Sequence, residues 1–389
     1  MKMNAKRWAS ALIAGIMTAG LLSGCGGGTD SSASAGNTPA PAGSTSGETA
    51  ALTPSGKTLV VGVQSSIISV PTVYAEEKGY FDELGLDVEL VIFPNGSPEN
   101  EGLAAEQLDI ASNGLASVFS MASGLCAWVA ETDTIGDSTW IFARPDDPVF
   151  EHKGELANRP EMYGSADTLK GKSILGATST ISHHMVAAYM AQFGLESGTD
   201  YEFLNMDNSA AVQAFLAGEG DMIGTADFNF VEQLEKGGAK KVASYQDATG
   251  GEFLNGILAR YDVLEERRDD VVLFLQGMYR AAEELQNDPE MRKEYCLKFY
   301  NDNGKSASEE AVAQEVASRV YVTPEYMKSD DYVLGYGMVG TGEFFASIGT
   351  IEDDQAENVK TAIDGSLIQD ALGISVKAAS GTDGAGLSA

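Results

Sequence analysis

Cysteine is scarce in this chain of 389 residues, which contains three. Cys25 lies near the N-terminus, and the other two are Cys126 and Cys296. No CxxC pair or cysteine–histidine spacing accompanies them, so the sequence does not indicate a zinc or redox site. We therefore expect neither a metal nor a cofactor. A disulfide between Cys126 and Cys296 and two buried free thiols are both compatible with the sequence.

Basic residues are also few. The 25 lysines and arginines stand against 57 aspartates and glutamates, which gives a formal net charge of -32 at pH 7. An acidic surface of this kind repels the phosphate backbone, so the composition excludes nucleic acid as a partner. The net charge favours solubility but does not identify a cationic ligand, because the field inside a binding site depends on the groups around it.

Long hydrophobic runs are absent as well. The apolar run at residues 8–22 follows Lys2, Lys6 and Arg7 and is shorter than the roughly 20 residues that cross a bilayer. Glycine and serine, rather than basic residues, come after it. This order is typical of a cleaved signal peptide, which we place at residues 1–24.

The end of the apolar run resembles the lipobox of bacterial lipoproteins, because the small residues Ser23 and Gly24 directly precede Cys25. The resemblance implies cleavage before Cys25 and acylation of its thiol, which would anchor an extracytoplasmic protein to the cell membrane. Residues 25–56 contain almost no large apolar side chains and are predicted to form a flexible linker with a reach of about 30 Å. Residues 374–389 are predicted to form a flexible tail.

Two parts of the chain show the same order of apolar runs and helical segments. In the first part, strands are expected at 59–63, 88–93 and 108–111, with helical sequence through Phe81 and at 99–107. In the second part, strands are expected at 173–177, 201–204 and 220–224, with helices at 183–193 and 210–217. The alternation predicts an α/β fold of two βαβαβ lobes with largely parallel sheets.

Two further apolar runs predict the connections between the lobes. Residues 139–143 are expected to leave the first lobe as a strand, with Trp140 in the hinge core, and 256–259 to return to it before a helix from Val263 to Leu285. Two crossings would form a hinge. The first lobe would then comprise residues 57–141 and 257–373 with the C-terminal helices, and the second lobe residues 142–256. A ligand cleft is expected between them, beyond the carboxyl ends of the strands.

Catalytic motifs are missing from the sequence. It contains no GxSxG and no HExxH. A hydrolytic set could be assembled only by residue type, from Ser182 with His183 or His184 and an acid such as Asp227. Adjacent histidines on a helix point about 100° apart, so His183 and His184 cannot bind one metal together. We therefore expect a binding protein and not an enzyme.

Several short motifs, in this order and spacing, resemble the periplasmic binding proteins of the second structural type. The similarity is to the branch that serves importers of nitrate, sulfonate, taurine and thiamine-pyrimidine precursors, and it spans residues 57–372. The motifs are Ala75–Phe81 with Gly85–Val88, Leu108–Ala111 with Gly114, Leu169–Lys172, and Ala217-Gly218 with Gly220-Asp221.

The resemblance implies a monomer that captures a small solute between closing lobes and delivers it to the permease and ATPase of an ABC importer. A ligand-sensing extracytoplasmic domain and a pyrimidine-biosynthetic enzyme on a related fold are the alternatives. The predicted lipoprotein signal argues against the cytoplasmic location of such an enzyme.

Candidate ligand contacts follow the predicted strands in both lobes. Those in the first lobe are Gln64, Ser65, Ser66, Asn95, Gly96, Ser97, Asn113 and Gly114; those in the second are Thr178, Ser179, Thr180, His183, Asp207, Asn208, Asp227 and Phe228. Several of these residues also suit helix capping or turns, and Phe228 also suits packing.

The chemical class of the ligand stays open in the sequence. No arginine lies at these strand ends, so an anion would rely on hydroxyls and helix N-termini. Asp227 would instead suit an amine or a ring nitrogen.

Overall fold

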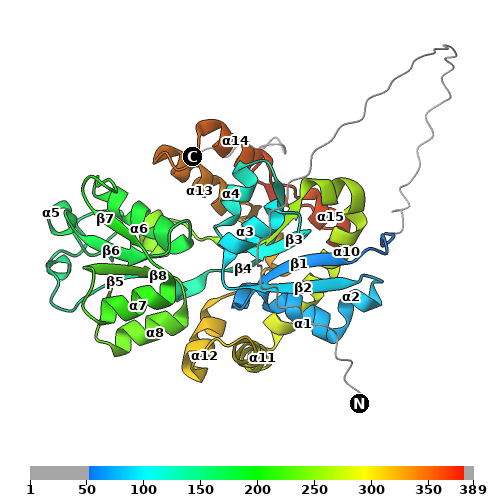
Figure 1. The fold of residues 1–389 in the computed structure, drawn as a ribbon, viewed down its shortest axis with the longest axis horizontal. Helices are drawn as coiled ribbons and strands as arrows, with labels where there is room; N and C mark the ends of the chain where they lie inside the picture. Colours follow the sequence, from blue (N-terminus) through cyan, green and yellow to red (C-terminus); the bar gives the residue numbers. More distant parts are fainter. Residues whose placement is uncertain (1–51, 381–389) are drawn as a thin grey trace, which may run out of the picture.

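The computed structural model describes residues 52–380. Within these residues the chain forms two lobes, each built on a five-stranded sheet (Figure 1). The predicted signal peptide, Cys25, most of the predicted linker and the end of the tail lie outside the described residues. No helix between residues 52 and 380 is both long and apolar enough to cross a bilayer.

The first lobe contains the sheet with strand order β2-β1-β3-β10-β4. Its strands are β1 (Leu59–Gln64), β2 (Val88–Phe93), β3 (Ile110–Asn113), β4 (Cys126–Thr134) and β10 (Leu254–Arg260). The helices between its strands are η1 (Ile67–Ser69), α1 (Val70–Lys78), α2 (Tyr80–Glu83), α3 (Gly96–Ala104) and α4 (Ser117–Ala122).

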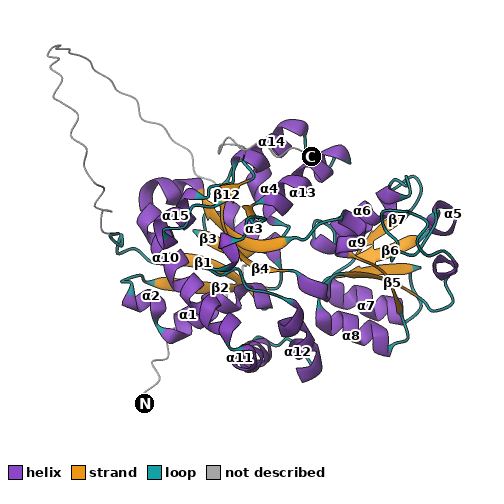
Figure 2. Cartoon of the chain, turned by 180° about the vertical axis from the view of Figure 1, so that it is seen from behind, coloured by secondary structure: helices purple, strands orange, loops and turns teal. Residues whose placement is uncertain are grey.

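The C-terminal part of the chain adds a group of helices to the first lobe (Figure 2). They are α10 (Tyr261–Asn287), α11 (Pro289–Asp302), α12 (Glu309–Ser318), η4 (Tyr326–Lys328), α13 (Tyr336–Ser347), α14 (Asp353–Thr361) and α15 (Ser366–Leu372). A two-stranded sheet joins β11 (Val333–Leu334) to β12 (Lys377–Ala378).

The second lobe contains the sheet with strand order β7-β6-β8-β5-β9. Its strands are β5 (Trp140–Ala143), β6 (Ser173–Gly176), β7 (Glu202–Asn205), β8 (Met222–Thr225) and β9 (Lys240–Ser244). Its helices are η2 (Gly136–Ser138), η3 (Pro148–Glu151), α5 (Ala166–Leu169), α6 (Ile181–Gln192), α7 (Asn208–Leu216), α8 (Phe228–Lys236) and α9 (Tyr245–Thr249).

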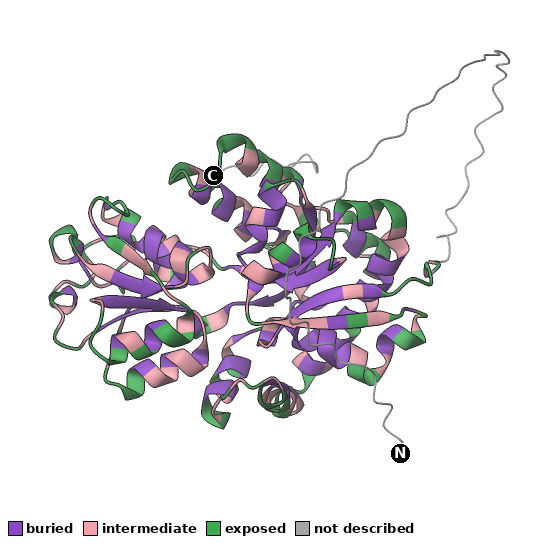
Figure 3. Cartoon of the chain, viewed as in Figure 1, coloured by how far each residue is buried: buried purple, intermediate pink, exposed green. Residues whose placement is uncertain are grey.

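The two sheets repeat one arrangement, which confirms the predicted pair of βαβαβ units. In each sheet three strands pair in parallel, and the strand that follows a crossing from the other lobe pairs antiparallel with one of them. This strand is β10, beside β3, in the first lobe and β5, beside β8, in the second. Both sheets are therefore mixed. The strands are largely buried, and exposed residues concentrate on the outer faces of the helices (Figure 3).

The strand that leaves the first lobe differs from the one predicted. It is β4, nine buried residues that include Glu131, Thr132 and Asp133, and these polar side chains hid the strand from a search for apolar runs. Residues 140–143 form β5, which pairs with β8 and β9 of the second sheet. The expected boundary after residue 141 therefore falls inside β5, and the one after residue 256 falls inside β10.

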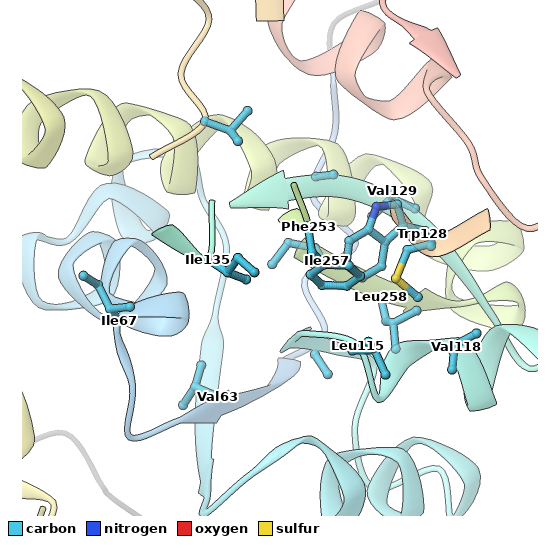
Figure 4. Close-up of a cluster of buried hydrophobic side chains, with 14 of the residues drawn as sticks. Val63, Ile67, Leu115, Val118, Trp128, Val129, Ile135, Phe253, Ile257 and Leu258 are labelled. Atoms are coloured by element: carbon cyan, nitrogen blue, oxygen red, sulfur yellow. The ribbon is translucent and has the colours of Figure 1, made fainter. Parts of the chain in front are cut away.

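The two segments that connect the lobes are hydrogen-bonded to each other. The amide of Ile135, after β4, donates to the carbonyl of Phe253, before β10, over 3.2 Å. Both side chains lie in a buried apolar cluster together with Trp128 and Ile257 (Figure 4). Residues of both connecting segments therefore pack in one apolar cluster.

Two further features of the first lobe bear on the predictions. Cys126 and Cys296 are both buried free thiols, which decides between the two states left open by the sequence. Near the start of the described chain, the amide of Ser55 donates to Asp270 of α10 over 2.8 Å. The N-terminal end of the described residues is therefore attached to the first lobe.

Candidate functional site

A cavity of about 550 Å³ lies between the two lobes. It is walled by the segments that follow β1, β2 and β3 in the first lobe and β6, β7 and β8 in the second. Most of the predicted contacts line it: Gln64, Ser65, Ser66, Asn95, Gly96, Ser97, Asn113, Gly114, Thr180, Asp207, Asn208 and Asp227. Their place at the strand ends agrees with the general rule for ligand sites in α/β folds. That they bind ligand stays a prediction.

Gln64 is held in place from beneath the cavity. Its side-chain nitrogen donates to Glu99 Oε2 over 2.9 Å and to the carbonyl of Ser112 over 3.2 Å. Glu99 is fully buried in α3, and burial raises the pKa of its carboxyl well above the ordinary value. Its Oε1 has no hydrogen-bond partner among the described residues.

The asparagines of the first lobe shape the loops of the cavity wall. Asn113 donates to the carbonyl of Gly96 over 3.0 Å and accepts from the amide of Gly114 over 2.6 Å. Asn95 accepts from the amide of Ser97 over 3.1 Å and so caps α3. A Cβ at Gly96 would lie 2.1 Å from Asn113 Oδ1, which explains the glycine at this position.

In the second lobe, two of the helices that begin at the cavity lack a side-chain cap. Thr180 precedes α6, but its hydroxyl donates to the carbonyl of Ala177 over 2.7 Å instead. Asp207 precedes α7, is exposed, and makes no capping hydrogen bond, so the alternative capping role is not seen. Asn208 Oδ1 is buried without a partner among the described residues.

Four predicted contacts do not line this cavity. Thr178 is exposed and its amide donates to Asn205, whereas Ser179 has a left-handed φ of 58°. The ring of His183 packs against Phe203 with centroids 4.5 Å apart, and burial lowers its pKa. From this segment the cavity lining instead takes Thr180, Ile181 and Ser182.

Phe228 was also expected in the site, but it is buried in the first turn of α8. Phe230, two residues later, lines the cavity. Successive helical residues point about 100° apart, so an offset of two positions reaches a different face.

The contribution of the C-terminal segment to the site was not predicted from the sequence. Lys305, Glu315 and Arg319 all line the cavity. One signal was available: Glu315 interrupts an otherwise apolar face of α12 that includes Val312 and Val316, and a charge on such a face indicates a buried ionic contact.

Lys305 forms an ion pair across the cleft. Its ammonium lies 2.6 Å from Asp227 Oδ2, at the start of α8 in the second lobe. Asp227 also caps α8 by accepting from the amide of Asn229 over 2.9 Å. Burial would raise the pKa of Asp227, but Lys305 and the capping bond together hold it below the ordinary value. Asp227 is thus already paired.

Arg319 is likewise occupied by neighbouring groups. It lies 2.9 Å from Asp133 Oδ2 and donates to the Ser138 hydroxyl over 3.0 Å. Glu315 Oε1 lies 3.7 Å from its Nε, and Tyr300 donates to the other Glu315 oxygen over 2.9 Å. Burial raises the pKa of Glu315, against the opposing effect of Lys305 and Arg319.

The lobes also touch outside the cavity. Ser308, just before α12, donates to Glu232 of α8 over 2.9 Å, and α12 lies beside α8 in both views (Figures 1 and 2). On the other side, the ring of His184 in α6 packs against Phe344 of α13 with centroids 4.6 Å apart. The lobes are therefore in contact on both sides of the cavity.

The residues considered for hydrolysis do not form a hydrogen-bonded set. The Ser182 hydroxyl lies 2.8 Å from that of Thr180, and His184 Nδ1 lies 2.9 Å from the Tyr245 hydroxyl. A nucleophile needs its base within hydrogen-bond reach. The geometry of these residues gives no support to the hydrolytic alternative.

Two α/β lobes that are joined by two chain crossings and have a cavity between them define the class of two-lobed solute-binding proteins. The chain is 30% identical over 317 residues to a putative ABC transporter periplasmic binding protein of Brachyspira hyodysenteriae, covering 81% of this chain and 90% of the relative. It belongs to the ABC transporter periplasmic binding proteins.

Other comparisons agree with this family. The family model described as NMT1/THI5 like matches residues 68–125 and 161–292. A putative aliphatic sulfonates-binding protein of Bacillus subtilis is 27% identical over 231 residues, which cover 58% of this chain and 64% of that protein.

Solved structures share the fold. The aliphatic sulphonate binding protein of Escherichia coli matches with a TM-score of 0.59 at 17% identity, over 77% of this chain and 91% of that one. The nitrate-binding protein of Synechocystis matches with a TM-score of 0.62 at 13% identity, over 82% of this chain and 89% of that one. The fold predicted from the sequence is confirmed.

Proposed function

We propose that this chain is the lipid-anchored, extracytoplasmic binding component of an importer, and that it captures a small solute in the interlobe cavity and delivers it to a permease driven by an ATPase. Membership of the periplasmic binding proteins supports the solute-binding role. We propose further that the protein performs no chemistry on the solute and acts as a monomer.

The observation that carries the proposal is the interlobe cavity itself. Its walls come from corresponding strand ends of both sheets, and a volume of about 550 Å³ is within the range of small-molecule sites. A ligand that contacts both walls would favour the closed arrangement, because it binds that arrangement more tightly than an open one. A permease could then distinguish the loaded protein by its shape.

Thermal unfolding with a panel of sulfonates, nitrate, pyrimidines, amines and amino acids tests solute capture. A ligand at a hundredfold its dissociation constant stabilises the folded protein by about 2.7 kcal/mol. The substitution Ser65→Phe, which fills the cavity, is expected to abolish the response, whereas Ser347→Phe on the exposed end of α13 is the matched control. If no compound on the panel stabilises the protein, or if Ser65→Phe leaves the response unchanged, solute capture in this cavity is wrong.

The lipid anchor is tested separately. Metabolic labelling with a fatty acid is expected to label the full chain and to leave Cys25→Ser unlabelled. Label that persists in Cys25→Ser would contradict acylation at this residue.

A further inference from the structure

The hydrogen bonds beneath the cavity fix the orientation of the Gln64 amide. Its nitrogen faces the Ser112 carbonyl at 3.2 Å, and a carbonyl can only accept a hydrogen bond. The oxygen therefore cannot occupy that position, and the second donor of the nitrogen is directed to Glu99. Gln64 Oε1 makes no hydrogen bond to the described residues, so the side chain offers the cavity an acceptor.

Asn255 is oriented in the same way from β10. Its nitrogen donates to Asp133 Oδ1 over 3.3 Å, while the other oxygen of Asp133 is ion-paired with Arg319. An ionised carboxylate can only accept, so Asn255 Oδ1 points away from it. That oxygen lies at the cavity wall, 2.7 Å from where a Cβ on Gly114 would stand. A second amide oxygen is thus offered to a ligand.

The charged side chains of the wall add to this pattern. Lys305 is paired with Asp227, and Arg319 with Asp133, so neither cation of the described lining is without a carboxylate partner. Asp207 is the opposite case: it is a carboxylate in the lining with no ion pair or hydrogen bond to its side chain among residues 52–380. The unpaired charge at the cavity is negative.

We infer that the solute carries a protonated nitrogen, as in an ammonium or amidinium group, whose N–H groups are received by the Asp207 carboxylate and the amide oxygens of Gln64 and Asn255. A donor-bearing cation satisfies these acceptors, whereas an anion would face them unpaired, and burying unpaired polar groups costs binding free energy. The inference rests on the proposed function and names the class of solute for the same cavity.

The helix N-termini do not reverse this conclusion. The starts of α3 and α8 are already capped by Asn95 and Asp227, and the Asp207 carboxylate precedes α7. Within residues 52–380, η1, α4 and α6 also begin at the cavity, without a side-chain cap or a charged residue at the N-cap. Their backbone N–H groups suit a neutral hydroxyl or carbonyl oxygen of the same solute.

Two matched series of probes test the inference by calorimetry and thermal unfolding on the full chain. One series is propylamine, 1-propanesulfonate and 1-propanol, and the other is benzylamine, phenylmethanesulfonate and benzyl alcohol. Within each series the hydrocarbon part is constant and the head group is cationic, anionic or neutral. We expect the amine to bind more tightly than the alcohol, and the sulfonate to bind least.

The substitution Asp207→Asn should weaken amine binding about tenfold, which corresponds to about 1.4 kcal/mol, and should weaken alcohol binding much less, because the alcohol carries no charge. Asp207 is exposed, so the variant should fold normally. Glu202→Gln, an exposed residue at the opposite end of β7, removes the same charge away from the cavity and is the control.

A sulfonate that binds more tightly than its matched amine would overturn the inference and still support solute capture. Amine binding that survives Asp207→Asn unchanged would also overturn it. So would the absence of binding by both amines, and in that case the broader ligand panel decides separately whether the protein captures a solute at all.

Discussion

At the scale of single residues, most polar side chains around the cavity are engaged by the protein itself. Asn113 closes two neighbouring loops, Thr180 binds the carbonyl before its helix, and Asp227 serves both a helix and a lysine. The wall is therefore fixed before a ligand arrives, which lowers the entropic cost of binding. The few groups left unpaired, such as Asp207, are the ones that distinguish between ligands.

Because of the buried Glu99 carboxyl, we expect the stability of the folded protein to fall as the pH rises. Burial raises its pKa in the folded state, so the folded protein binds this proton more tightly than the unfolded chain. The resulting stabilisation is complete below the unfolded pKa of about 4.3 and is lost as the pH rises through the folded pKa. Glu99→Gln cannot titrate and should be more stable than the wild type at pH 8, with a smaller loss between pH 5 and 8.

Urea unfolding at several pH values measures this difference. Glu202→Gln, at an exposed position, is expected to follow the wild-type curve. Parallel curves for the wild type and Glu99→Gln would contradict a raised pKa for Glu99.

At the scale of elements, the close packing of β10 beneath the indole of Trp128 in β4 explains why this strand contains a glycine. A Cβ at Gly256 would lie 2.1 Å from the Ala130 carbonyl and 2.4 Å from the Trp128 ring. Neither neighbour can move freely, because both belong to the β4 strand that pairs with β10. The contact fixes how the two crossing strands lie together.

Gly256→Ala should therefore destabilise the protein by about 1 to 3 kcal/mol, as overpacked cores do. Gly251→Ala is the control, because a Cβ there meets no atom within 4 Å and the backbone is not left-handed. The midpoint of urea unfolding compares the two variants. Equal midpoints would show that β10 can shift to make room.

The elements also show what sequence patterns can and cannot predict. The strand at 88–93 is found with the predicted bounds, because its apolar residues are continuous and a Pro-Asn-Gly turn follows. The cavity residues after β1, β2 and β3 were predicted in the same way, because the ends of these strands could be read from the sequence. Strand β4 was missed because its last residues are polar and buried. The roles of Lys305 and Arg319 depend on contacts between segments far apart in the chain, which no local pattern contains.

At the scale of the whole molecule, the ion pair between Lys305 and Asp227 connects the lobes independently of the two crossing strands. Ser308 and Glu232 reinforce the same edge of the cleft. These contacts favour the arrangement in which the cavity is enclosed, so they set how much of the free energy of closure the ligand has to supply.

Lys305→Met should leave Asp227 without its partner and reduce stability by about 3 kcal/mol, because a largely buried carboxylate is then uncompensated. Small-angle X-ray scattering should show a larger radius of gyration as the lobes separate. The double variant Lys305→Met with Asp227→Asn should recover part of the stability that Lys305→Met alone loses.

Lys328→Met removes an exposed pair with Glu325 and is expected to cost less than about 1 kcal/mol without a change in shape. An unchanged radius of gyration in Lys305→Met would mean that the crossing strands alone hold the lobes together.

The attachment of Ser55 to Asp270 has a consequence for motion at the cell surface. If Cys25 carries a lipid, the chain between Cys25 and Ser55 would tie the membrane to the first lobe only. The first lobe would then keep its orientation relative to the membrane, and closure would move mainly the second lobe. A transporter docked from the membrane side would then sense arrival of cargo mainly as a change in the position of the second lobe.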